Sequence, residues 1–422
     1  MRSHRRVWLG VAVATVAASV LTACAPPIPL GDGVVVITTD VSPALATALE
    51  ESFTAWSQTS GIKVSVDVVD EVDAASAGDI GLWSSVSALM ASHSEENPRD
   101  IAQLTQGEGE PWTERLLPGL RAPVTTEEDA VVLGVPFSVG VDTLVYANPQ
   151  AFAEHGYTIP TTGAQTGALA ESVTADETGF PWCAGVEAGA DSGREFANWL
   201  DYAILNISGP EAYGQWRRGE LAPDAPAVAR AVTALEETLL NDSAVKGGRN
   251  GVALNGYANT APLFEKAWRK NGQCLLYIGG SEITTTFPEA VVTEVIAGDD
   301  SRLAVLPFMM GADDEFSLIA TASYFSAIAL DEDVVAVLEY AASPEFAEKM
   351  TPAPGYLSPW KSSDAVVYAD PVTTSIGSIL QRATTIELNR FAYLTDAEQQ
   401  EFLAVVMAYL SGDANWSGAL AE

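Results

Sequence analysis

The chain has 422 residues, which is too long for one small domain and typical of a protein with two lobes of ordinary size. It is 48% hydrophobic and 18% charged, which excludes a coiled coil, a disulfide-rich miniprotein and a largely disordered chain. The 21 Lys and Arg against 56 Asp and Glu give a net charge of −35, and the sequence has no basic stripe, so a nucleic-acid partner is not expected.

The N-terminal segment has the features of an export signal. Three arginines in the first six residues precede an uncharged apolar run over 7–21, which is shorter than the roughly 20 residues of a membrane-spanning helix. The run ends in Leu21-Thr22-Ala23-Cys24, which resembles the lipobox of bacterial lipoproteins, where the cysteine is lipidated and the chain is cut before it. We expect a lipoprotein signal peptide over 1–23, a lipid anchor at Cys24 and an extended, proline-rich linker over 24–33. The alternative is an ordinary secreted protein.

The other two cysteines form an even pair. In an oxidising compartment Cys183 and Cys274 are expected to form a disulfide, and two separately buried thiols are the alternative. A metal site would need more ligands, because the mature chain has only His93 and His155 and lacks HExxH, paired CxxC and calcium-loop patterns. We therefore expect no metal and no cofactor.

The first part of the mature chain alternates strands and helices. A β-branched apolar run over 34–38 predicts a buried parallel strand, apolar residues at helical spacing follow Pro43, and 63–69 alternates like a second strand. A helix at about 80–92 and a short third strand over 100–104 complete a βαβαβ order. Such an order predicts right-handed crossovers and a mostly parallel sheet.

The next part of the chain predicts a second sheet. An extended segment over 135–146 is expected to leave the first lobe. Strands over 180–186 and 274–278 are separated by helices at about 195–220, 226–240 and 260–270. Strand-type sequence returns at 303–307 and 318–330, and helical patterns at about 333–350, 373–385 and 395–411 close the chain.

These elements predict an α/β fold with two lobes, each with its own sheet. We place the first part of lobe 1 at 34–140 and the first part of lobe 2 at 141–319. The chain is expected to return to lobe 1 over 320–345 and to end in lobe 2 helices over 346–422.

No catalytic motif stands out in the sequence. It lacks a GxSxG elbow, a Walker loop and a GxGxxG turn after a strand, and two histidines leave little scope for a Ser-His-Asp triad. Acidic residues are abundant, and no spacing singles out a pair for glycoside hydrolysis. A binding protein is therefore expected rather than an enzyme.

Several segments carry a resemblance to a known family. The stretches 96–102 and 135–148 are similar to the third-strand approach and the first lobe crossing of extracellular solute-binding proteins of family 1, the receptors of ABC sugar importers. The segments 181–187, 192–193, 198–200 and 209–216 resemble the α-glucoside-type members, and the match continues at 337–340, 343–344 and 355–359. Those members also carry a cysteine at the position of Cys274, which supports the disulfide. The resemblance implies a periplasmic-binding-protein-like fold, in which two doubly wound lobes are joined by a multi-strand hinge.

The chain departs from the pattern of this family at four places. Arg194 stands where the family commonly has Trp, and Thr321-Ala322-Ser323 lies near its Gly-Gly-Asp stretch. The family's Cys-Trp is Cys274-Leu275, and its late Arg-Phe-Asp motif is replaced around 387–390. These departures bear on which sugar the protein binds and not on its role in transport.

The resemblance implies a hinged receptor whose lobes close on a ligand. Aromatic side chains should cover the faces of a sugar ring, and polar side chains at the carboxyl ends of strands should receive its hydroxyls. The candidates are Asp40, Asp70, Glu71, Gln103 and Gln106 in the first lobe, Arg194, Ser281 and Glu282 in the second, and the aromatic residues Tyr324, Tyr356 and Trp360.

We therefore expect a monomeric receptor, lipid-anchored on the extracellular face of the cell membrane. It would capture a carbohydrate, an oligosaccharide or an α-glucoside, and deliver it to ABC permease subunits. One alternative is a receptor of the same fold for a non-sugar, anionic solute, which Arg194 would favour. The other is a secreted glycosidase, which turnover of the ligand would reveal.

Overall fold

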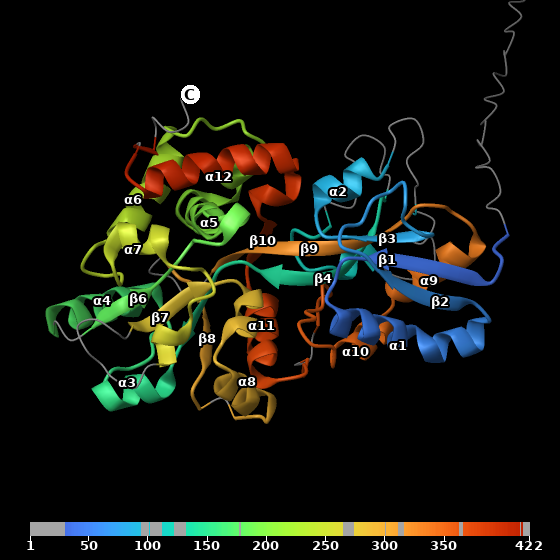
Figure 1. Ribbon diagram of the computed structural model, residues 1–422, viewed down its shortest axis with the longest axis horizontal. Helices are drawn as coiled ribbons and strands as arrows, with labels where there is room; N and C mark the ends of the chain where they lie inside the picture. The colour runs from blue at the N-terminus through green and yellow to red at the C-terminus, as the bar shows by residue number, and fades with distance from the viewer. Residues whose placement is uncertain are drawn as a thin grey trace, which may run out of the picture.

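A computed structural model describes residues 30–93, 101, 112–121, 132–176, 179–264, 274–299, 301–310, 316–362, 366–413 and 415–416. The predicted signal peptide, Cys24 and most of the linker lie outside these ranges, as do Gln103 and Gln106. Figure 1 shows two lobes side by side, each with its own sheet. Among the helices described, none combines the length and the apolar character that crossing a membrane requires.

The first sheet is mixed. Its strands are β1 (Val34–Thr39), β2 (Lys63–Val68), β3 (Ile80–Trp83), β4 (Val135–Val141), β9 (Ser317–Ala327) and β10 (Thr385–Leu388). They are ordered β10-β9-β3-β1-β2, and β4 also pairs with β9. Strands β1, β2 and β3 are parallel to one another, as are β9 and β10, whereas β9 is antiparallel to both β3 and β4. Three of the five strand pairings are therefore parallel, which agrees with the mostly parallel sheet that we expected, and both antiparallel pairings involve β9.

Helices α1 (Pro43–Ser60), α9 (Glu332–Ala341) and α10 (Pro344–Met350) pack in the first lobe. The Ser42 side chain caps α1, Pro43 starts it, and Gly61 ends it with a φ of 80°, a left-handed conformation that glycine adopts without strain. The Phe53 ring of α1 lies 5.3 Å from the Phe346 ring of α10. This buried contact places α10 in the first lobe, so our boundary at 346, which assigned this helix to lobe 2, is corrected.

The segment after β2 also differs from our expectation. Residues 80–83, predicted as the start of a helix, form β3, whose four side chains are all buried. A buried position between β1 and β9 favours the extended chain there. Ser85 then caps a short helix, α2 (Val86–Ala91). Of the predicted third strand at 100–104, only Ile101 is described, and it is not in a strand.

The second sheet has the order β6-β7-β5-β8. Its strands are β5 (Leu144–Ala147), β6 (Phe180–Cys183), β7 (Cys274–Gly279) and β8 (Ala304–Pro307). The parallel strands β6 and β7 are joined by the predicted disulfide between Cys183 and Cys274, whose Cα atoms are 5.5 Å apart. Cys183 is the last residue of β6 and Cys274 is the first residue of β7.

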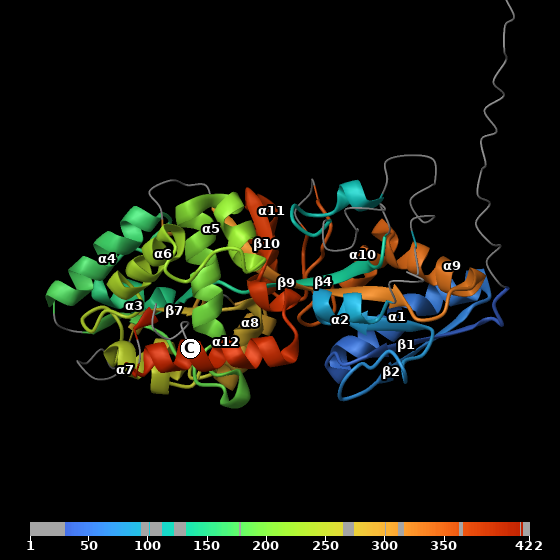
Figure 2. The ribbon, with the colours of Figure 1, turned by 90° about the horizontal axis from the view of Figure 1, so that it is seen from above.

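Helices surround the second sheet (Figures 1 and 2). They are α3 (Pro149–His155), α4 (Gly163–Asp176), α5 (Arg194–Arg217), α6 (Pro226–Glu237), α7 (Gly248–Leu254), α8 (Glu289–Ile296), α11 (Pro371–Arg382) and α12 (Asp396–Leu410). The short 3-10 turns described in the two lobes together are η2 (Trp112–Arg115), η4 (Gly189–Asp191), η5 (Ala261–Phe264), η6 (Ser281–Thr286) and η7 (Arg390–Tyr393). The long helix α5 is central to this lobe and buries Trp199 and Trp216.

Two long strands connect the lobes. The antiparallel pair β4 and β9 runs across the middle of the molecule (Figure 1). Residues Asp142 and Thr143 lead directly from β4 into β5 of the second sheet. Strand β9 begins beside β10, where Ile319 lies in the core of the second lobe. It ends beside β3 in the first lobe. The lobe junction is therefore built from extended strands, as the 135–146 segment predicted.

Candidate functional site

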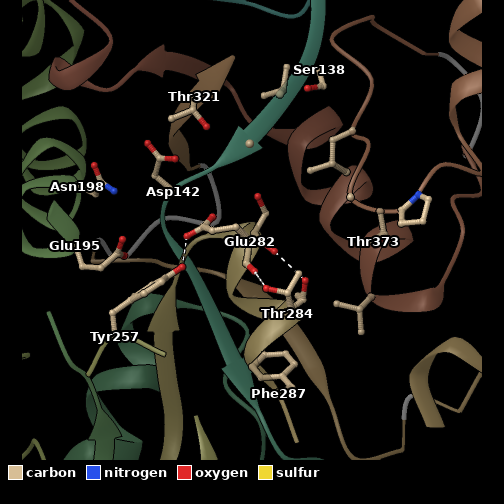
Figure 3. A pocket seen from close by; sticks show the side chains of 18 of the residues that line it. Ser138, Asp142, Glu195, Asn198, Tyr257, Glu282, Thr284, Phe287, Thr321 and Thr373 are labelled. Carbon is tan, nitrogen blue, oxygen red and sulfur yellow. Dashed lines mark hydrogen bonds between the residues drawn. The ribbon is translucent and has the colours of Figure 1, made fainter. Parts of the chain in front are cut away.

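A cavity of about 840 Å³ lies at the junction of the two lobes. Figure 3 shows it between β4 and β9, the start of α5, the η6 turn and the start of α11. Small-molecule sites in proteins commonly have volumes of roughly 300–1,000 Å³, so the cavity has the size of a binding site. Its polar lining includes Ser138, Asp142, Glu195, Asn198, Tyr257, Ser281, Glu282, Thr284, Thr321, Ser323, Thr373 and Asn389.

The Asp142 carboxyl lies where the chain passes between the lobes. Its backbone N–H donates to the carbonyl of Ile319 at 2.9 Å, which extends the β4–β9 pairing by one residue. The Asn389 side chain donates to Asp142 Oδ2 at 2.7 Å, and the Asn389 backbone is itself bound to the Ala320 carbonyl. The Asn389 side chain therefore binds this carboxyl, and both residues are fixed to β9 through their backbones. Asp142 is only 5% exposed.

The start of α5 supplies Glu195 and Asn198. Gly193 precedes the helix with a φ of 96°, and a Cβ there would lie 3.0 Å from Val406 Cγ1, so glycine is suited to this entry. Residues three apart lie on one helix face, which turns Glu195 and Asn198 together toward the cavity. Both are buried, and Glu195 Oε2 and Asn198 Oδ1 have no hydrogen-bond partner in the structure.

The η6 turn supplies Ser281 and Glu282. Ser281 Oγ accepts from the backbone N–H of Val141 at 3.1 Å, so this turn is attached to the end of β4. The Tyr257 hydroxyl donates to Glu282 Oε1, and the Tyr257 carbonyl in turn accepts from the Tyr277 hydroxyl at 2.5 Å. Glu282 thus faces the cleft and is bound by Tyr257. Tyr277 in turn binds the backbone of Tyr257.

The three carboxyls influence one another. Burial raises the pKa of Asp142 to about 8, the negative charge of Glu282 adds to this, and the Asn389 hydrogen bond opposes it. Burial also raises the pKa of Glu195 well above its usual value, with further contributions from Glu282 and Asp142. Loss of hydration in the cleft raises the pKa of Glu282, against the effect of the Tyr257 hydrogen bond. Like charges in a site of low dielectric are not all ionised together.

Arg194 lines the same cavity but is already engaged. Its Nη2 donates to Asp191 Oδ1 at 2.9 Å and to Gln399 Oε1 at 3.1 Å. The guanidinium also lies 4.5 Å from the centre of the Phe391 ring, close enough for a cation–π contact. The arginine therefore fastens the start of α5 to η4 and α12.

The structure brings together three of the predicted site residues. Arg194, Ser281 and Glu282 line the cavity. Asp40, Asp70 and Glu71 are exposed and are not among its lining residues, because they follow β1 and β2, which lie away from the β4–β9 junction. The predictions for Gln103 and Gln106 fall outside the described residues.

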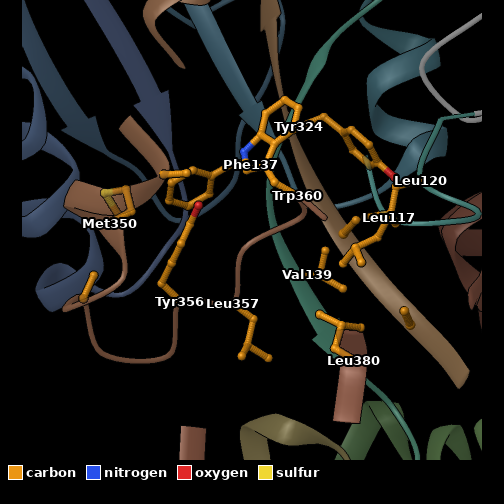
Figure 4. Packing of buried hydrophobic residues seen from close by; sticks show 14 of the residues in the cluster. Leu117, Leu120, Phe137, Val139, Tyr324, Met350, Tyr356, Leu357, Trp360 and Leu380 are labelled. Carbon is orange, nitrogen blue, oxygen red and sulfur yellow. The ribbon is translucent and has the colours of Figure 1, made fainter. Parts of the chain in front are cut away.

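The three predicted aromatic contacts are core residues instead. Tyr324 and Tyr356 have no exposed surface and Trp360 is 9% exposed. Figure 4 shows them in the apolar cluster of the first lobe, where the Tyr356 ring lies 5.6 Å from Phe137. Burial of these large rings contributes to folding, and none of them lines the cavity. The aromatic rings that do line it are Tyr257 and Phe287.

Several of the residues that line the cavity were not identified from the sequence. A carboxyl at Asp142 interrupts the apolar run of β4 and β5, and Glu195 interrupts a helix face that otherwise buries Phe196, Trp199 and Leu200. A charged residue in an apolar context is a signal for a functional position, and it was available in both segments. No such signal marked Tyr257, whose position depends on the path of the chain before η5.

The cavity has the chemistry of a binding site for a polar molecule. Carboxyl, amide and hydroxyl groups from both lobes face one space, and Phe287 offers an apolar ring on the side of η6. Within the described ranges, no group of three or more His, Cys, Asp or Glu has the arrangement of a metal site.

Comparisons with known proteins agree with this arrangement. A family model described as bacterial extracellular solute-binding protein matches residues 41–348. The chain is 24% identical over 359 residues to the osmoprotective compounds-binding protein GgtB of Synechocystis sp., covering 81% of this chain and 80% of that protein. It is 26% identical over 255 residues to the alpha-glucosides-binding periplasmic protein AglE of Rhizobium meliloti, covering 60% of this chain and 54% of that protein.

A solved structure shares the fold. The bacterial solute receptor AcbH, described with an exclusive preference for β-D-galactopyranose, superposes with a TM-score of 0.70. The superposition covers 92% of this chain and 94% of that one, at 12% identity. The likeness extends over both lobes, so the α/β architecture predicted from the sequence is confirmed.

Proposed function

Since this chain belongs to the bacterial extracellular solute-binding proteins, and is thus an ABC-type solute receptor and not an enzyme, we propose that its solute is a carbohydrate. The observation that carries this proposal is the cavity between the lobes, in which hydroxyl, amide and carboxyl groups converge from both sheets. A sugar presents a rim of hydroxyls that both donate and accept hydrogen bonds, and such a lining can satisfy them.

We propose an oligosaccharide or an α-glucoside as the ligand. A volume of about 840 Å³ leaves room for more than one sugar ring. The name of AglE refers to α-glucosides and that of AcbH to a galactopyranose, so carbohydrate receptors are found among both the relatives and the solved structures. Phe287 and Tyr257 are the rings that would cover the sugar faces, in place of the three aromatic residues predicted from the sequence.

A panel of neutral mono- to trisaccharides, with α-glucosides included, tests this function. A ligand present at 100 times its dissociation constant should stabilise the folded protein by about 2.7 kcal/mol, which thermal unfolding detects. Asn198→Ala removes one lining amide and should weaken binding by about tenfold, which corresponds to the loss of one good hydrogen bond. Asn250→Ala, at an exposed position of α7, is the matched control and should bind like wild type. Failure of every carbohydrate to stabilise the protein would refute the proposal.

An anionic solute, the alternative that Arg194 suggested, is less well supported by the geometry. Arg194 Nη2 is bound by Asp191 and Gln399, and the carboxyls of Asp142, Glu195, Glu282 and Asp370 line the same cavity. An anion that bound Arg194 would approach these carboxyls, which is electrostatically unfavourable.

We also propose that the receptor is a monomer, anchored through a lipid on Cys24 to the outer face of the membrane. The support is the apolar run over 7–21 followed by Leu21-Thr22-Ala23-Cys24. Labelled fatty acid should enter the protein in a bacterial host, and Cys24→Ser should lose the label and be released to the medium. Equal labelling of the variant and the wild type would contradict the anchor.

A further inference from the structure

The innermost part of the cavity has more hydrogen-bond acceptors than the protein uses. Glu195 is 7% exposed and its Oε2 has no hydrogen-bond partner, and Asn198 is 5% exposed with an unpartnered Oδ1. Both face the cavity from the same side of α5 (Figure 3). A buried acceptor without a partner costs free energy, so a bound molecule that donates hydrogen bonds here would recover that cost.

The same region is crowded with acidic groups. Glu282 acts electrostatically on both Asp142 and Glu195, and Asp201, which lies behind the cavity on α5, acts on Asp142. Arg194 is the one basic residue among the described lining residues, and it only partly offsets these charges. Its Nη2 donates to Asp191 and Gln399, and none of the hydrogen bonds or ion pairs of the described residues joins Arg194 to Asp142, Glu195 or Glu282.

This region calls for two properties in a ligand, a hydrogen-bond donor and a positive charge, and a neutral sugar hydroxyl has only the first. It can donate one hydrogen bond to a carboxyl, but it brings no positive charge to the acidic groups. A protonated amine donates up to three hydrogen bonds and carries a positive charge, which favours the ionised form of these carboxyls. Hydrogen bonds in which both partners are charged are also the stronger class.

Building on the proposed carbohydrate function, we propose that the ligand of this receptor carries a protonated amine. The ammonium group would lie between Glu195, Asp142 and Glu282, with Asn198 Oδ1 as a further acceptor, and the hydroxyls of the sugar would face Ser138, Thr321 and Thr284. The class of ligand is thus an amino sugar or another glycoside of a polyhydroxylated amine.

The acidic groups also give this ligand a distinct pH dependence. The pKa of Asp142, Glu195 and Glu282 is raised in the free protein, so these carboxyls hold protons that a cation must displace. Affinity for an amine should therefore increase between pH 5 and pH 7 and be accompanied by proton release. A neutral sugar does not compete with these protons, so its affinity should change little over the same range.

Matched sugar pairs test the proposal by isothermal titration calorimetry. Suitable pairs are trehalosamine with trehalose, the β-1,4 glucosamine disaccharide with cellobiose, and glucosamine with glucose. We expect at least one amine to bind tenfold or more tightly than its neutral partner at pH 7, with protons released to the buffer.

Isosteric variants then separate charge from shape. Glu195→Gln keeps the size of the side chain and an acceptor oxygen but removes the charge, and it should reduce the preference for the amine at least tenfold. Glu237→Gln removes one charge at the exposed end of α6 and should leave the preference unchanged. Circular dichroism of both variants checks that they fold.

Two results would overturn the inference, and they differ. If neutral sugars bind as tightly as their amines, the ligand class is wrong while the carbohydrate receptor stands. If neither neutral nor amino sugars bind, the carbohydrate function itself fails and the inference fails with it.

Discussion

At the scale of single residues, the buried carboxyls are the unusual feature of this molecule. Asp142 lies in the two-residue connection between β4 and β5, so its position is set by strands of both lobes. The backbone leaves the first sheet and enters the second at this point, and the Asp142 side chain is almost fully buried. A neutral, protonated carboxyl is the form that this environment favours.

The free energy of unfolding should therefore depend on pH in a definite direction. Burial raises the pKa of Asp142 to about 8, against about 4 in the unfolded chain. Between these values the folded state holds a proton that the unfolded state has released, so stability is highest at low pH and falls as the pH rises toward 8. Asp142→Asn should remove this contribution and be more stable than wild type at pH 8.5 by about 1–3 kcal/mol, the range for a buried polar group.

Urea denaturation of the ligand-free protein at pH 5 and pH 8.5 measures the effect. Burial also raises the pKa of Glu195 and Asp201, so wild type and variant should both lose stability with pH, but the variant less. Glu237→Gln serves as the control for loss of one charge elsewhere. Equal losses in wild type and Asp142→Asn would show that this carboxyl is ionised in the folded protein at low pH.

At the scale of elements, α5 decides how the second lobe meets the site. The helix is broken at Gly209, where φ is 88° and ψ is 168°, and Pro210 follows. Asp201 in the first half accepts from Trp216 Nε1 at 2.8 Å and from the Tyr213 hydroxyl at 3.2 Å in the second half. It also accepts from the Arg390 backbone N–H at 2.8 Å. These bonds hold the two halves at a fixed angle, and the first half presents Glu195 and Asn198 to the cavity.

Two glycine substitutions test the break in α5. Gly209→Ala should destabilise the protein by about 1 kcal/mol or more, because an alanine is strained at positive φ even though the site has space for a methyl group. Gly167→Ala, inside α4 with nothing near the added methyl, should instead stabilise it by about 0.5–1 kcal/mol. Denaturant unfolding of both variants measures the two changes. A stabilising Gly209→Ala would mean that the helix is not broken there.

At the scale of the whole molecule, the β4–β9 pair is the natural hinge. It joins the two lobes (Figures 1 and 2), and residues of both strands, Ser138 of β4 and Thr321 of β9 among them, line the cavity. A ligand that contacts Ser138 and Thr321 on one side and Glu195 and Glu282 on the other has more contacts when the lobes are close together. Such a ligand stabilises the closed arrangement by its difference in affinity for the two states.

Small-angle X-ray scattering should detect this closure. Addition of a saturating carbohydrate, identified from the panel, should reduce the radius of gyration of the wild-type protein. Asn198→Ala at the same ligand concentration should compact less, because a smaller fraction is bound. An unchanged radius in the fully bound wild-type protein would contradict hinge closure.

Local patterns in the chain were sufficient for much of the architecture. The strand β1, the helix α1 and the crossing through β4 and β5 were predicted because each depends on neighbouring residues. The signals were an apolar run, apolar residues at helical spacing after Pro43, and an extended segment. Cys183 and Cys274 were paired for a different reason, since only two cysteines remained once Cys24 was assigned. The family resemblance then predicted two hinged lobes.

The site depended on contacts between residues that are far apart in the chain. Tyr324 and Tyr356 have the side chains of a sugar site, but the packing of β9 and the loop after α10 turns them into the core. Asp142, Glu195 and Glu282 meet because β4, α5 and η6 converge at the lobe junction. Local sequence determines which residues form a strand or helix, whereas the strand order and the position of the hinge determine which side chains share a cavity. That arrangement is fixed only when both lobes are folded and the chain has crossed between them.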